Sequence, residues 1–291
     1  SIFITGGAGY VGSHLVPEFL NKGYKVTVYD ILYFGKNFLP ENHKNLSIIK
    51  GDIRDNEKLF ESCKKHDIFL NLACISNDTS FVLDEKLSTT INLDAFEPMV
   101  IAAKKAKIKR FLYASTSSVY GVSSKKDVTE DHPLVPLTLY NKYKGMCEPL
   151  LLKHTDKNFK GVVFRPATVC GYAPRLRLDL SVNILTNFAI NKSFIKVFGG
   201  DQLRPNLHIH DYFRAVETLI TASDEKIENQ IFNVGYQNLS ISDLAQKVKS
   251  VVEKEFPEKK NIEIVKSPSD DKRSYHINSD KIKKILGFVP K

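Results

Sequence analysis

Long hydrophobic runs are missing from this sequence of 291 residues. No run approaches the roughly 18 consecutive apolar residues that a membrane-spanning helix needs, and no signal-peptide pattern precedes the first apolar segment. We therefore expect a cytoplasmic protein that is not inserted in a membrane. The first expected strand already begins at Ile2 and the last apolar segment ends at Pro290, so we also expect native residues beyond both ends.

Metal-ligand spacings are absent as well. The four cysteines (Cys63, Cys74, Cys147 and Cys170) form no Cys-x-x-Cys pair, which favours reduced thiols in a cytosolic protein. His208 and His210 could share one face of a strand, but only Asp211 lies nearby in the sequence to complete a ligand set. We therefore predict a structural role for these histidines and no bound metal.

A basic stripe interleaved with aromatic residues is the third absence, although the formal net charge is +9. The lysines are scattered, and the cluster at 104–110 is typical of the solvated end of a helix. We therefore expect no nucleic-acid partner. A positive surface would instead help to gather a doubly charged nucleotide diphosphate.

What the sequence does contain is the glycine-rich turn Thr5-Gly-Gly-Ala-Gly-Tyr-Val-Gly12, between a strand-like and a helical segment. Glycines permit a tight turn and a close approach of the backbone to a pyrophosphate, and the amides that open the helix face this anion. A second strand-like segment, 25–29, leads into Asp30, whose carboxylate can bind ribose hydroxyls and would repel a 2′-phosphate. We predict a site for NAD rather than NADP; its residues are Gly6, Gly9, Tyr10, Val11, Gly12 and Asp30.

Strand-like and helical segments keep alternating after this turn. Further strands are expected at 46–50, 67–71, 110–114 and 161–165, and helices at 57–65, 84–107 and 140–153. This alternation predicts an α/β fold with a doubly wound parallel sheet, the Rossmann arrangement. We expect an NAD-binding domain over residues 1–165, to which 211–233 return, and a smaller C-terminal α/β substrate-binding lobe formed by 166–210 and 234–291.

A second group of reactive side chains comprises the hydroxyl-rich turn Ser115-Thr-Ser-Ser118 and the motif Tyr140-x-x-x-Lys144. On a helix the phenol and the ammonium lie one turn apart on the same face. A nearby ammonium and the positive charge of oxidised nicotinamide would both lower the pKa of the phenol from about 10. Such a tyrosine can remove the proton of a sugar hydroxyl while a hydroxyl of the turn holds the substrate oxygen. The alternative is an exposed helix that happens to carry tyrosines and lysines.

Together these motifs resemble the extended short-chain dehydrogenase/reductases. More narrowly they resemble the NAD-dependent nucleotide-sugar epimerase/dehydratase branch of the UDP-glucose 4-epimerase type, over nearly the whole chain. The resemblance implies a catalytic set of Thr116, Ser117, Tyr140 and Lys144. It places further residues along the cofactor, which are Asp52, Ile53, Leu72, Ala73 and Ser115, and implies that Tyr140 and Lys144 also touch it. The residues that it implies at a nucleotide-diphosphate sugar are Thr168, Asn183, Arg204 and Arg273. Thr168 stands where the family often has asparagine. Arg175 and Arg177 either bind substrate or cover the lobe's surface, and the two interpretations are equally favoured.

One departure from the family bears on the reaction. Members that are 4,6-dehydratases carry Thr-Asp-Glu where this chain has Thr116-Ser117-Ser118, so elimination of water is poorly supported. We predict a 4-epimerase that works through a transient 4-keto sugar. The alternatives are a 4-dehydrogenase or 4-keto reductase that releases the keto sugar and, from another class, a catalytically idle dinucleotide-binding protein.

The resemblance also implies a homodimer that pairs through the helical segments 84–107 and 140–153. The apolar residues of these segments suit a core or an interface equally well; they include Phe96, Met99, Val100, Leu150 and Leu151.

Overall fold

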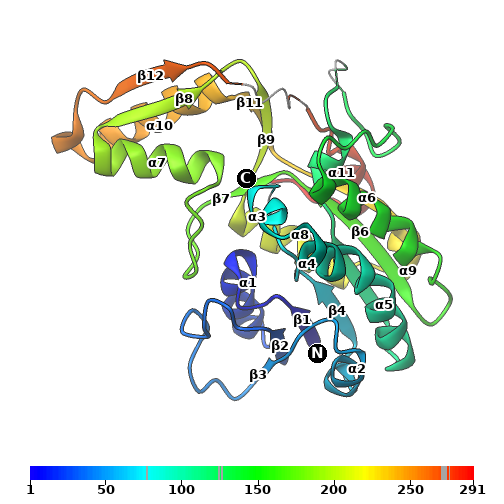
Figure 1. Ribbon diagram of the computed structural model, residues 1–291. Helices are drawn as coiled ribbons and strands as arrows, with labels where there is room; N and C mark the ends of the chain where they lie inside the picture. The colour runs from blue at the N-terminus through cyan, green and yellow to red at the C-terminus, as the bar shows by residue number, and fades with distance from the viewer. Residues whose placement is uncertain (77, 124, 126, 270–273, 275) are drawn as a thin grey trace.

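A seven-stranded parallel sheet forms the centre of the computed structural model, which describes all residues except 77, 124, 126, 270–273 and 275 (Figure 1). The strand order is β3-β2-β1-β4-β5-β6-β10. The bounds are β1 (Ile2–Thr5), β2 (Val26–Asp30), β3 (Leu46–Lys50), β4 (Ile68–Asn71), β5 (Arg110–Ala114), β6 (Lys160–Pro166) and β10 (Ile231–Val234). The predicted doubly wound sheet is confirmed. Its order reverses between β1 and β4, the point at which such sheets bind ligands.

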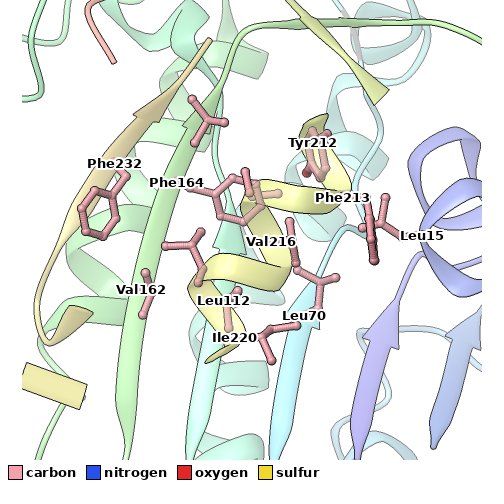
Figure 2. Close-up of a cluster of buried hydrophobic side chains, with 14 of the residues drawn as sticks. Leu15, Leu70, Leu112, Val162, Phe164, Tyr212, Phe213, Val216, Ile220 and Phe232 are labelled. Atoms are coloured by element: carbon pink, nitrogen blue, oxygen red, sulfur yellow. The ribbon is translucent and has the colours of Figure 1, made fainter. Parts of the chain in front are cut away.

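Alternate residues of each strand face opposite helical layers, so the strands are apolar on both sides. Ile2 and Ile4 belong to one buried cluster, and Phe3 between them belongs to another. The first layer consists of α1 (Tyr10–Asn21) and α8 (Ile209–Thr221). Figure 2 shows side chains of these helices against those of the sheet, among them Leu15, Phe213, Val216 and Ile220 opposite Leu70, Leu112 and Val162.

The other face is covered by α2 (Asn56–Cys63), α5 (Phe96–Lys105) and α6 (Leu139–Leu152). In this layer the rings of Phe69 and Phe111 stack with their centroids 4.6 Å apart. Four of the five apolar residues proposed for a dimer interface are buried in this core (Phe96, Met99, Val100 and Leu151), and Leu150 packs against them. The pairing of two chains stays a prediction.

The segment 84–107 is helical but is not one regular helix. After α3 (Asp78–Leu83) come α4 (Glu85–Thr89), a π-helical turn (Thr90–Asp94) and α5. In the π turn the Asn92 amide accepts a hydrogen bond from the Ile75 backbone N–H at 2.8 Å and donates one to its carbonyl at 2.9 Å. The wider turn therefore lets Asn92 hold the loop that follows β4.

A second group of elements lies at the upper left of Figure 1. It contains the sheet β11-β9-β7 (Gln237–Ser240, Leu203–His208 and Thr168–Cys170) and the pair β8 (Phe194–Phe198) with β12 (Glu263–Ser267). The helices α7 (Ser181–Lys192) and α10 (Ile241–Glu255) share an apolar cluster with this pair.

The end of the chain returns to the large sheet. Between α8 and β10 lies the short α9 (Asp224–Ile227), and α11 (Asp280–Leu286) contacts β10. Ile282 and Phe288 belong to the same buried cluster as α1 and α8. The domain boundaries given above stay a prediction. Among the described residues, no helix is long and apolar enough to cross a membrane.

A buried ion pair joins α6 to β6. The guanidinium of Arg165 donates two hydrogen bonds to the Glu148 carboxylate, at 2.9 and 2.6 Å, and both side chains are 3% exposed. Ser115, just after β5, donates to the same carboxylate at 2.6 Å. Arg165 also donates to the Tyr120 oxygen, and the Tyr120 hydroxyl donates to Asn233 of β10. One polar network therefore links β5, α6, β6 and β10.

We expect Arg165→Met to lower the free energy of unfolding by about 3–5 kcal/mol, because it leaves the Glu148 carboxylate buried without its partner. Urea denaturation followed by circular dichroism measures the change. The double variant Arg165→Met/Glu148→Leu is the matched control and should recover most of the loss, since no buried charge remains. A single variant as stable as the parent would contradict this role of the pair.

Candidate active site

The turn between β1 and α1 passes close to the backbone of the segment after β4. Gly6 has a φ of +73°, and a Cβ at this position would lie 2.7 Å from the Ala73 nitrogen. The N-cap of α1 is Gly9, which offers no side-chain cap, and the first turn holds no acidic residue. No carboxylate within the first turn of α1 therefore competes for the amides that open this helix, as the pyrophosphate of NAD requires.

Asp30, at the end of β2, fixes the glycine turn. Its carboxylate accepts hydrogen bonds from the backbone N–H groups of Ala8 at 3.0 Å and Leu32 at 2.7 Å. The acid expected at the cofactor ribose therefore lies directly beside the turn expected at the pyrophosphate. A carboxylate has about four lone-pair sites, so two remain for ribose hydroxyls.

The other residues expected along the cofactor follow three further strands at the same edge of the sheet. Asp52 and Ile53 come after β3, Leu72 and Ala73 after β4, and Ser115 after β5. Ile53, Ala73 and Lys144 line one small cavity. The Asp52 carboxylate accepts hydrogen bonds from Arg54, which lower its pKa below the usual range.

The Tyr10 hydroxyl makes hydrogen bonds within the protein, and the expected contact of Tyr10 with the cofactor stays a prediction. Its hydroxyl, at the start of α1, donates to the Gly171 carbonyl at 2.7 Å and accepts from the Asn183 amide at 3.3 Å. Asn183 also donates to the Arg177 carbonyl and accepts from the Gly171 N–H. The Asn183 amide therefore joins the start of α1 to the loop after β7, and its contact with a substrate stays a prediction.

The helix α6 places Tyr140 and Lys144 one turn apart. Thr138 caps the helix by accepting from the Asn141 N–H at 3.3 Å. The Lys144 ammonium is buried and donates to the Ala114 carbonyl at 2.7 Å. This bond fixes α6 against the end of β5.

Burial raises the pKa of Tyr140 well above its ordinary value, and the nearby Cys74 acts in the same direction. The Arg177 guanidinium opposes them and lowers that pKa. Arg177, whose role the sequence left undecided, therefore acts on this phenol as a cation. General-base chemistry at Tyr140 depends on such positive charge, because burial alone holds the phenol protonated.

Polar neighbours hold the Arg177 side chain in place. Its guanidinium donates to both oxygens of Asp179, at 3.0 and 2.5 Å, and to Ser76 at 3.2 Å, and its side chain is 16% exposed. The motif Arg-x-Asp in 177–179 was visible in the sequence, but nothing there indicated that it reaches α6. Arg175 instead stacks on the Phe34 ring, 3.7 Å from its centroid.

The hydroxyl turn lies after β5 and begins a 3₁₀ helix (Ser117–Tyr120). Thr116 caps this helix, and its hydroxyl accepts from the Ser118 N–H at 3.2 Å. Ser117 is buried, and its hydroxyl oxygen has no hydrogen-bond partner among the described residues.

A cleft with a volume of about 370 Å³ opens beside this turn. It brings together Ser118 with the predicted substrate residues Thr168 of β7 and Arg204 of β9. Lys196 of β8 also lines it, a residue that the sequence analysis did not identify. The predicted Arg273 lies outside the described residues. The next residue, Ser274, accepts a hydrogen bond from the Leu203 N–H at 3.1 Å, beside Arg204.

We expect Asp30→Asn to lower the ratio of NAD affinity to NADP affinity by at least about tenfold, because it removes the charge that repels a 2′-phosphate. The amide oxygen of asparagine can still accept a hydrogen bond from the backbone. Titration of both cofactors by calorimetry measures the ratio. Asp55→Asn, a cap of α2, is the matched control and should keep the parent's ratio. A parent that prefers NADP, or an unchanged ratio in Asp30→Asn, would contradict the role of Asp30.

Comparison with known proteins agrees with this geometry. The model of the NAD dependent epimerase/dehydratase family matches residues 2–235. A UDP-N-acetyl-alpha-D-glucosaminuronate decarboxylase of Bacillus cytotoxicus is 32% identical over 257 residues, which are 84% of this chain and 78% of that protein. A UDP-glucose 4-epimerase of Rhizobium leguminosarum bv. trifolii is 26% identical over 100% of this chain and 92% of its own length. The structure of a Thermotoga maritima UDP-glucose 4-epimerase with UDP-glucose has a TM-score of 0.86 at 25% identity, covering 100% of this chain and 93% of that one. The chain therefore belongs to the NAD-dependent epimerase/dehydratase family, as an enzyme of its nucleotide-sugar class that uses NAD.

Proposed function

We propose that this enzyme is a 4-epimerase of a nucleotide-diphosphate sugar and that it works through a transient 4-keto sugar. The observation that carries the proposal is the position of Tyr140 on α6. Arg177, from the loop after β7, lowers the pKa of its phenol, and Lys144 of the same helix binds the end of β5. Lys144, one turn after Tyr140, holds α6 against the end of β5 at the edge of the sheet where the cofactor is expected. The hydroxyl turn that follows β5 contributes Ser118 to the cleft that also contains Arg204.

Tyr140, as the phenolate, takes the proton of the sugar 4-hydroxyl and later returns a proton to the 4-oxygen. Thr116 holds this oxygen with its hydroxyl. Bound NAD supplies the hydride acceptor for C4 and the donor that returns the hydride to the opposite face. Arg177 stabilises the phenolate throughout, because its guanidinium remains charged at every accessible pH.

The nucleotide diphosphate would bind in the cleft. Arg204 and Lys196 both line it, and we propose that Arg204 and Arg273 grip the pyrophosphate. Arginine suits this role because its planar fork donates two hydrogen bonds to phosphate oxygens. The UDP-sugar activities of the relatives support a uridine diphosphate as the nucleotide part.

Dehydration is disfavoured because it requires an acid and a base at the hydroxyl turn. Thr116, Ser117 and Ser118 supply neither. Two carboxylates contact the network around this turn, the buried Glu148 and the half-buried Glu130, and both are engaged. Glu148 binds Arg165, and Glu130 accepts from the Asn233 N–H at 2.6 Å.

A second candidate is decarboxylation of a uronic acid, which the relative from Bacillus cytotoxicus favours. Oxidation at C4 by Tyr140 would also begin this reaction, and the 4-keto group would then activate loss of the carboxylate. A 4-dehydrogenase or 4-keto reductase would begin in the same way and release the keto sugar. Only the product distinguishes the three.

We expect incubation with neutral and uronic UDP-, GDP-, dTDP- and CDP-sugars to give an epimer of unchanged mass without net reduction of NAD, as read by NMR, mass spectrometry and absorbance. Tyr140→Phe should lower turnover by at least about a hundredfold while retaining NAD, since only the proton acceptor is lost. Tyr143→Phe is the matched control on the same helix, because Tyr143 packs on Phe81. A keto or decarboxylated product would contradict epimerisation and identify one of the alternative reactions. Near-normal turnover of Tyr140→Phe would exclude Tyr140 as the base.

We expect Arg177→Met to shift the pH dependence of kcat/KM to higher pH. The guanidinium lowers the pKa of Tyr140, so its removal raises that pKa, and the rate that depends on the phenolate then appears only at higher pH. Arg175→Met is the control, since Arg175 stacks on Phe34. An unchanged profile in Arg177→Met, measured under conditions where binding of the nucleotide sugar is intact, would show that Arg177 does not act on the base.

A further inference from the structure

We propose that His14, Glu18 and His210 form a binding site for a divalent transition metal of the Zn²⁺ class, between α1 and α8. The imidazole nitrogens and the carboxylate oxygen that these three residues offer all lie within 4.8 Å of one another. The site involves none of the residues proposed for catalysis or for the substrate.

Two helices bring the three side chains together. His14 and Glu18 are four residues apart on α1 and therefore share one face of it. His210 is the second residue of α8, which packs beside α1. The rings of His14 and His210 have centroids 6.0 Å apart and are nearly perpendicular, at 88°.

Only a small adjustment is needed to close the site. Bonds of about 2.0–2.1 Å to tetrahedral Zn²⁺ place the ligand atoms about 3.3 Å apart, so the observed spacing must shrink by at most about 1.5 Å. The His210 side chain is exposed and the Glu18 side chain has three rotatable bonds, so both are able to move by this amount.

The polar atoms of the cluster are not committed elsewhere. The Nε2 atom of His14 is buried and has no hydrogen-bond partner in the described part of the chain. A ligand at this atom would therefore satisfy a buried polar group that otherwise lacks a partner. Glu18 takes part in no ion pair with a described residue.

The donor set defines the class of metal. Two imidazoles and one carboxylate are a ligand set of Zn²⁺, with a fourth position left for water. Mg²⁺ and Ca²⁺ prefer oxygen ligands throughout and would not be selected by two histidines.

His208 is not part of this set. Its Nδ1 accepts from the His210 N–H at 3.3 Å and caps α8, and its ring packs against Gly171. The sequence alone suggests a pairing of His208 with His210, for which we predicted no metal. The proposed ligand set instead combines His210 with two residues of α1 that are distant in the sequence, His14 and Glu18.

The experiment uses the full chain after treatment with a chelator. We expect calorimetric titration with Zn²⁺ to show a site with a stoichiometry of one, and Co²⁺ to give the visible absorption of a low-symmetry nitrogen-oxygen site. Bound Zn²⁺ should also raise the melting temperature, because it binds only the folded chain. Glu18→Gln and His210→Gln should each weaken Zn²⁺ at least about tenfold, with NAD binding and circular dichroism unchanged.

His208→Asn is the matched control, because it removes a neighbouring imidazole and should leave the Zn²⁺ affinity unchanged. Three results would overturn the proposal. They are the absence of Zn²⁺ binding by the parent, undiminished binding by both Glu18→Gln and His210→Gln, and loss of the site in His208→Asn. Because the measurement is of metal binding, its outcome is independent of the reaction that the enzyme catalyses.

Discussion

The ion pair of Arg165 and Glu148 sets the geometry on which the catalytic side chains depend. Burying two charges costs several kcal/mol per ion, which their attraction only partly offsets, so such a pair is better understood as a positional constraint than as a large source of stability. Here it holds α6 against the end of β6, and Ser115 binds the same carboxylate from the end of β5. The helix that carries Tyr140 and the turn that carries Thr116 are therefore fixed relative to each other.

The phenol at this junction is under opposing electrostatic influences. Burial raises the pKa of Tyr140, and Arg177 lowers it. Because Arg177 comes from the loop after β7, the cation that acts on the proposed base belongs to a segment outside the seven-stranded sheet. Asn183 holds this loop, since its amide donates both to the Arg177 carbonyl and to the Tyr10 hydroxyl at the start of α1. Hydrogen bonds of Asn183 thus connect the start of α1, where the cofactor is expected, with the loop that carries Arg177.

Much of the sheet could be predicted because its signals are local. The segments 46–50 and 110–114 coincide with β3 and β5, and the glycine turn lies between β1 and α1 as its spacing indicates. The same locality explains what could not be predicted. The π turn around Asn92 exists because its amide binds the Ile75 backbone, and Arg177 acts on Tyr140 across two elements. Contacts of this kind depend on the folded arrangement and leave no periodic pattern in the sequence.

The outcome of the reaction depends on which acids surround the 4-keto sugar, because the first step is shared. In the proposed chemistry Tyr140 begins epimerisation, decarboxylation and dehydration alike. Elimination would also require a carboxyl acid and a carboxylate base at the hydroxyl turn, where this chain has Ser117 and Ser118. The Glu148 carboxylate cannot be recruited without breaking its pair with Arg165. Glu148 therefore serves the structure, and in the proposed mechanism the hydroxyl groups of the turn support return of the hydride better than elimination.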